Sequence, residues 1–181
     1  MNTIPALTDL VEVPSREPLV TAGAELADLD LVGASVESRC AYYQQVCQMP
    51  AMLDPTSDQI IFVAGRVQAV MVPWALGQRV RSELDRADAG CGPIVSHPKS
   101  ESWTFITQSD RRIDSLPDDT LLWVNNVVVM ASGVRIGLPT PTATNADPCR
   151  VWELPPTSPQ RPTTTTVLDA VRTCLKRGET R

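Results

Sequence analysis

The segment that most constrains the fold is residues 59–90, in which two short apolar runs precede a patterned helix. The runs at 60–64 and 67–72 are separated by a Gly-Arg pair, which predicts two strands joined as a hairpin. Pro73 follows at once, and proline favours the first turn of a helix because its missing N–H needs no partner there. We expect that helix to continue to about residue 87. Its apolar face repeats at helical spacing through Leu76, Val80 and Leu84.

The remaining segments complete a mixed fold. Further strands are predicted at 93–96, 102–107, 121–130, 134–138 and within 145–154. Helices are predicted after Ser35, with Val36, Cys40, Tyr43 and Cys47 on one face, and at 164–177, with Val167, Val171 and Cys174 or Leu175 facing the core. We interpret 1–34 as an irregular lead, 155–162 as a proline-rich linker and 35–181 as a single domain. The sequence therefore predicts an α+β fold with a mixed, antiparallel-rich central sheet flanked by helices.

Charge and cysteine usage narrow the function. The formal net charge of -5 at pH 7 disfavours tight, salt-dependent binding to nucleic acid. The five cysteines are widely spaced and include no CxxC pair, which argues against structural zinc and favours reduced thiols. No apolar run approaches the ~20 residues that span a membrane, and the N-terminus lacks the pattern of a signal peptide. We therefore expect a cytoplasmic protein without a membrane segment.

Three segments in serial order resemble a known family. They are IIFVAGRVQAVMVPWALGQRVRSELD, GPIVSHPKSESWTFIT and VVVMASGVRIGLPTPTATNADPCRVWEL. Together they cover roughly residues 59–155. Their order resembles the motifs of the primase-polymerase domain in the archaeo-eukaryotic primase superfamily, and is most similar to the reduced bifunctional DNA primase/polymerase forms of actinobacteria. The resemblance implies a primase-polymerase-like core, with the helix at 164–177 as an addition.

The resemblance also implies which chemistry has been lost. In that family, two carboxylates of the first motif and one of the third hold divalent metals, and a histidine of the second contacts the incoming nucleotide. In this sequence the first motif has Met71, Val72, Pro73 and Trp74, the second has Trp103, and the third has the run 127–130 that includes Val128. Apolar side chains cannot hold two metal ions. The resemblance therefore implies a domain without catalytic residues, metal or cofactor.

The single histidine and the basic residues are the other candidates. His97 lies six residues before Trp103, too far to be the family histidine displaced by one position, and we interpret it as a surface or turn residue. Possible nucleic-acid contacts along a residual groove are Arg66, Arg79, Lys99, Trp103 and Arg135. The alternative is that the aromatic residues fill the space that metals and nucleotide would occupy.

Three functions remain open from the sequence. The first is a non-catalytic binding or regulatory module that acts through a protein partner. The second is a weak nucleic-acid or nucleotide binder that uses the residual groove. The third is a nucleotidyltransferase whose divalent metals are held elsewhere, for example by Asp28 and Asp30, which are spaced to point to one side of a strand. A homodimer formed through sheet edges is also open.

Overall fold

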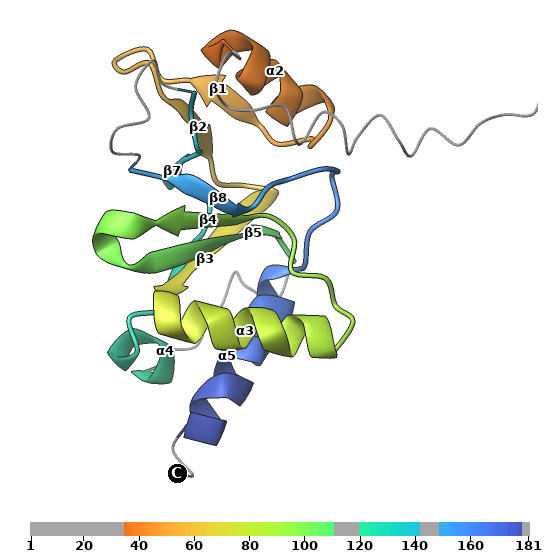
Figure 1. The fold of residues 1–181 in the computed structure, drawn as a ribbon, viewed down its shortest axis with the longest axis vertical. Helices are drawn as coiled ribbons and strands as arrows, with labels where there is room; N and C mark the ends of the chain where they lie inside the picture. Colours follow the sequence, from red (N-terminus) through yellow and green to blue (C-terminus); the bar gives the residue numbers. More distant parts are fainter. Residues whose placement is uncertain (1–34, 111–119, 142–148, 179–181) are drawn as a thin grey trace, which may run out of the picture.

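The computed structural model describes residues 35–110, 120–141 and 149–178 (Figure 1). The helices are α2 (Val36–Gln45), α3 (Trp74–Arg86), α4 (Thr120–Val124) and α5 (Thr164–Gly178), with a 3-10 turn η1 (Pro98–Ser100). The strands are β1 (Ala51–Leu53), β2 (Ile60–Val63), β3 (Val67–Pro73), β4 (Ile94–His97), β5 (Ser102–Gln108), β6 (Val128–Met130), β7 (Arg135–Gly137) and β8 (Val151–Leu154). The predicted α+β class is confirmed.

The strands form two antiparallel sheets rather than one central sheet. The large sheet has five strands in the order β6-β3-β5-β4-β8, and the small sheet has three in the order β1-β2-β7. Figure 1 shows α3, α4 and α5 on one side of the large sheet, with the small sheet and α2 on the other. The large sheet is therefore the middle layer of the described fold.

Two hydrophobic cores lie on opposite faces of the large sheet. β3 and β5 contribute to both, because successive side chains of a strand point to opposite faces. The helical core lies against α3 and α5, and its buried residues include Val70, Val72, Leu76, Val80, Leu84, Trp103, Phe105, Val167 and Val171. The inter-sheet core lies toward the small sheet and α2, and its buried residues include Cys40, Tyr43, Cys47, Ile60, Phe62, Ala69, Val95, Ile106 and Ile136. Burial on both faces explains why the run at 67–72 is apolar except for Gln68, which is itself buried.

The predicted hairpin between 60–64 and 67–72 is wrong, although both strands form. β2 pairs with β1 and β7 in the small sheet, whereas β3 pairs with β5 and β6 in the large sheet. The Gly-Arg pair is a crossing between the sheets. There the N–H of Ala64 donates to the carbonyl of Val134, and the N–H of Gly133 donates to the carbonyl of Ala64. Because both strands are largely apolar on both faces, their local pattern does not select a partner.

The predicted strand at 121–130 is wrong in its first half, which forms the short helix α4. Only Val128–Met130 is a strand. Asn126 follows the helix with a φ of 54°, a left-handed conformation that asparagine tolerates better than most residues. Leu122 and Val127, on either side of the turn, are both buried in the helical core. The run is therefore apolar on both sides of the turn that separates the helix from the strand.

Two further segments differ from the sequence-based interpretation. β1 was not predicted, because Ala51–Leu53 is too short to produce a strand pattern. The segment 155–162 is packed against the fold and is not a free linker. The carbonyl of Pro156 accepts a hydrogen bond from the hydroxyl of Tyr42 at 2.9 Å, and the carbonyl of Pro162 accepts one from the N–H of Gln108 at 2.8 Å. The predicted lead at 1–34 lies outside the described residues.

Candidate functional site

The positions matched to the family motifs come together at one end of the large sheet. β3 lies between β6 and β5, so all three matched segments are on neighbouring strands. In register, Val72 faces Trp103 across the β3–β5 pair, and Met71 faces Val128 across the β3–β6 pair. Trp74 follows directly as the first residue of α3 and is 48% exposed.

These positions do not share one face of the sheet. Val72 is fully buried and Trp103 is 3% exposed, both in the helical core. The Trp103 ring lies against Gly77 of α3, where an added Cβ would be 2.8 Å from the ring atom Cε3. The buried indole N–H of Trp103 has no hydrogen-bond partner among the described residues. Trp103 is therefore a packing residue and cannot stack on a nucleic-acid base.

The opposite face at this end, which we name the open face, consists of Met71, His97, Thr104 and Val128. Met71 pairs with both Thr104 and Val128 in register, so these three side chains point the same way. Val128 is 45% exposed and Met71 is partly exposed. A thioether, an isopropyl group and a hydroxyl give this face few oxygen ligands for a hard divalent cation.

His97 ends β4 and is half-buried, not a freely exposed turn residue. Its Nε2 lies 2.8 Å from the hydroxyl of Thr104. Burial lowers the pKa of His97 below its ordinary value, and the nearby positive charge of Arg150 lowers it further. The imidazole is therefore neutral at pH 7. Thr104 is only 2% exposed, so its hydroxyl orients the ring and is not accessible as a nucleophile.

The predicted nucleic-acid contacts are dispersed over the molecule. Arg66 precedes β3 and Lys99 precedes β5, and these antiparallel strands are each seven residues long. Arg66 and Lys99 thus lie at opposite ends of the strand pair, about 20 Å apart at ~3.3 Å per residue. Arg79 is on α3, which covers the face where Trp103 is buried, and Arg135 is on β7 of the small sheet. The structure does not bring these residues into one groove.

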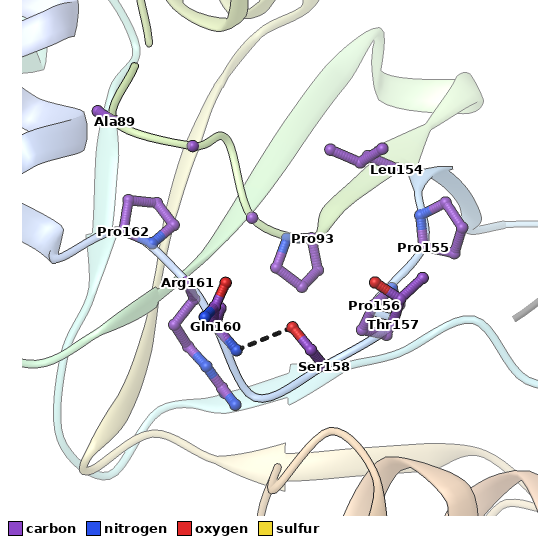
Figure 2. A pocket seen from close by; sticks show the side chains of 12 residues that line it. Ala89, Pro93, Leu154, Pro155, Pro156, Thr157, Ser158, Gln160, Arg161 and Pro162 are labelled. Carbon is purple, nitrogen blue, oxygen red and sulfur yellow. Dashed lines mark hydrogen bonds between the residues drawn. The ribbon is translucent and has the colours of Figure 1, made fainter. Parts of the chain in front are cut away.

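A pocket of about 550 Å³ lies where 155–162 passes the start of β4 (Figure 2). We name it the proline pocket. It is lined by Ala89, Gly90, Gly92, Pro93, Leu154, Pro155, Pro156, Thr157, Ser158, Gln160, Arg161 and Pro162. Its volume is in the range of small-ligand sites. Pyrrolidine rings and Leu154 form apolar walls, and hydroxyl groups lie along one side (Figure 2). Apart from Arg161, this lining is mostly apolar and suits a mostly apolar group.

The wall of the proline pocket is held in place from outside. Nη2 of Arg161 donates to the carbonyl of Cys47, just past the end of α2. Burial lowers the pKa of Arg161 below its ordinary value. The electrostatic interaction with Cys47 raises the pKa, but by less than burial lowers it. Gly92 has a φ of 62°, and a Cβ there would lie 2.5 Å from Cδ of Pro162. The sequence shows only that 155–162 is rich in proline. The contacts of this segment with the rest of the fold are what make it the wall of a pocket.

The described part of the chain has neither a metal-binding cluster nor a membrane-spanning helix. Within 35–110, 120–141 and 149–178, no group of three or more His, Cys, Asp and Glu side chains is placed to hold a metal ion. None of the described helices is both long and apolar enough to cross a membrane. Asp28 and Asp30 lie outside the described residues.

Comparison with protein-family models found no family that matches the chain, and comparisons with curated proteins and with solved structures also found no match.

Proposed function

We propose that the chain is a non-catalytic relative of primase-polymerases that acts as a binding or regulatory module through a protein partner. One observation carries the proposal. The three motif-like segments lie on the adjacent strands β6, β3 and β5, and at the end where they meet Met71 is in register with both Thr104 and Val128. Three motifs matched by order alone need not have been neighbours in space.

The residues at this end support a loss of metal-dependent chemistry. Magnesium and manganese are held by carboxylate and other oxygen ligands, and two-metal catalysis needs several of them on one face. The open face offers the single hydroxyl of Thr104, which is already engaged with His97 at 2.8 Å. On the other face, Val72 and Trp103 pack under α3. Apolar packing at these positions removes the desolvation cost that buried carboxylates would carry.

Exposed apolar residues near β6 support a protein partner. Trp123 is 80% exposed, Val124 is 59% exposed and Val128 is 45% exposed, and all three fall within six residues of the chain. Trp74, the first residue of α3, is 48% exposed. Aromatic residues are enriched in the centres of protein interfaces, whereas single-stranded nucleic acid needs aromatic side chains beside a basic groove. All five cysteines are free thiols, which is consistent with our expectation of a cytoplasmic location.

The catalytic part of the proposal is tested with purified full-length chain, primed template, deoxynucleotides and either Mg²⁺ or Mn²⁺. We expect no primer extension. Extension by the wild type that is lost in Asp28→Ala would instead support a nucleotidyltransferase with displaced ligands. Fluorescence anisotropy with single- and double-stranded oligonucleotides at low and moderate salt tests the groove, and we expect no binding through Arg66 or Arg135.

The partner part is tested by quantitative affinity capture with three baits. A specific partner should be retained by the wild type and by Arg66→Gln, and lost by Trp123→Ser. The two substitutions are both at exposed positions, so both variants should fold. Identical protein sets on all three baits would contradict a partner that binds through the residues near β6.

A further inference from the structure

A hollow of about 580 Å³ lies where α3 packs against α5. Both helices lie on the side of the large sheet opposite the small sheet (Figure 1). We name this space the arginine hollow. It is lined by Gln78, Arg79, Ser82, Glu83, Arg86, Cys174, Arg177 and Gly178. The α3 residues recur at three- and four-residue spacing, so they form one face of the helix. The helices are held together beneath it by the helical core. The hollow is thus a feature of the packed helix pair.

Two arginines share one carboxylate in this hollow. Oε1 of Glu83 accepts a hydrogen bond from Arg86, and Oε2 accepts one from Arg177 at 2.7 Å. The Glu83 side chain is 15% exposed, whereas those of Arg86 and Arg177 are each 61% exposed. The hydrogen bond from Arg86 is the main cause that lowers the pKa of Glu83, followed in effect by the charge of Arg177. Glu83 is therefore ionised and fixes the two guanidinium groups side by side.

Arg79 completes the set from one turn earlier in α3. Its Nη1 donates to the carbonyl of Cys174 at 3.2 Å. That carbonyl lies four residues before the end of α5, where the partial negative charge of the helix C-terminus disfavours an anion. Arg79 is held by this hydrogen bond and places a third positive charge at the wall of the hollow, which offsets the charge of the helix end. Among the described residues that line the hollow, one carboxylate against three guanidinium groups leaves a surplus of two positive charges.

We infer that the arginine hollow binds a phosphate group. A guanidinium has five N–H donors in a planar fork that matches phosphate oxygens, and the bonds described here use one nitrogen of each arginine. The exposed parts of Arg86 and Arg177 leave further donors facing the hollow or solvent. A phosphate monoester carries about two negative charges at pH 7, which matches the surplus. This inference does not rest on the proposed function, because none of the residues that line the hollow belongs to the open face.

The probe is inorganic phosphate, titrated into the ¹⁵N-labelled full chain and followed through the arginine Nε–Hε signals by NMR. We expect the signals of Arg79, Arg86 and Arg177 to move together with one saturation curve. The double variant R86Q/R177Q should bind phosphate about tenfold more weakly or worse, because hydrogen bonds to charged groups exceed neutral ones in strength. The control R66Q/R135Q removes the same formal charge elsewhere and should bind like the wild type.

Glu83→Gln gives a second test with the opposite sign. It removes the internal carboxylate that competes for Arg86 and Arg177, so phosphate should bind more tightly than to the wild type. An unphosphorylated single-stranded oligonucleotide then distinguishes the source. If it moves the same three signals more strongly than inorganic phosphate does, the ligand is a nucleic-acid backbone; if it does not, the ligand is a small phosphorylated molecule. Absence of saturable binding, or equal binding by both double variants, would overturn the inference.

Discussion

The contact between Gly77 and Trp103 gives the sharpest test of how the matched end of the large sheet is built. Gly77 is buried in α3, and a Cβ added there would lie 2.8 Å from Cε3 of Trp103 and 3.2 Å from its Cβ and Cδ2. Alanine at a helical glycine position stabilises the helix by about 1 kcal/mol. Forcing a methyl group into a packed core costs about 1–3 kcal/mol. The Trp103 ring is buried and rests edge-to-face on Phe105 at 6.5 Å between centroids, so it cannot move away freely. We expect Gly77→Ala to destabilise the fold by up to about 2 kcal/mol.

The effect of Gly77→Ala on stability should change sign when the Trp103 ring is absent. In a Trp103→Leu background, which is itself destabilised by the lost burial, the added methyl group no longer meets the ring atom Cε3. Gly77→Ala should then recover its helical gain of about 1 kcal/mol. The two measurements differ by the coupling energy of the contact, which a double-mutant cycle isolates.

Urea unfolding followed by far-UV circular dichroism measures these free energies without relying on tryptophan fluorescence. Ala75→Gly, at an exposed position of the same helix, calibrates the helix-propensity contribution and should destabilise by about 1 kcal/mol. If Gly77→Ala stabilises the protein equally in both backgrounds, the Trp103 ring does not pack on α3 and the placement of β5 under that helix is refuted.

Three further predictions concern single residues. His97 is the only histidine, so an NMR titration should give a single imidazole pKa below its ordinary value. Because the folded pKa is lowered, the contribution of His97 to stability is full above the ordinary pKa and is lost as the pH falls toward the folded pKa. The variant His97→Gln should remove this pH dependence of stability. Gly92→Ala should lower the melting temperature more than Gly90→Ala, because both glycines have a positive φ but only Gly92 is crowded by Pro162. Equal decreases in melting temperature would show that Gly92 and Pro162 are not in contact. The native chain should react with one equivalent of a thiol reagent, at the exposed Cys149, and C149S should abolish that reaction; a second fast equivalent would contradict the burial of the other four thiols.

Much of the element order was predictable from local patterns. The helix after Pro73 was found because apolar residues recur at Leu76, Val80 and Leu84, and those side chains are buried as the spacing requires. The helix at 164–177 was predicted in the same way, and α5 spans Thr164–Gly178. These elements each carry one buried stripe, which the sequence displays directly.

Strand partners and the short helix α4 were not predictable in this way. A strand that is apolar on both faces carries no information on which neighbour it pairs with, so the hairpin assigned to 60–64 and 67–72 had the right strands and the wrong sheets. The strand predicted at 121–130 was wrong for a related reason. Its apolar residues are spread between helix, turn and strand, and only the left-handed conformation at Asn126 separates them.

The candidate sites show the same division. The sequence by itself determined that Val72, Trp103 and Val128 cannot serve as metal ligands, because side-chain chemistry does not depend on the fold. Tertiary structure alone decided that Trp103 packs on Gly77 and that the residues of the proline pocket line one cavity. It also decided that Arg79 and Arg177, 98 positions apart, share one hollow. Contacts between segments far apart in the chain follow from helix and sheet packing, which local periodicity does not encode.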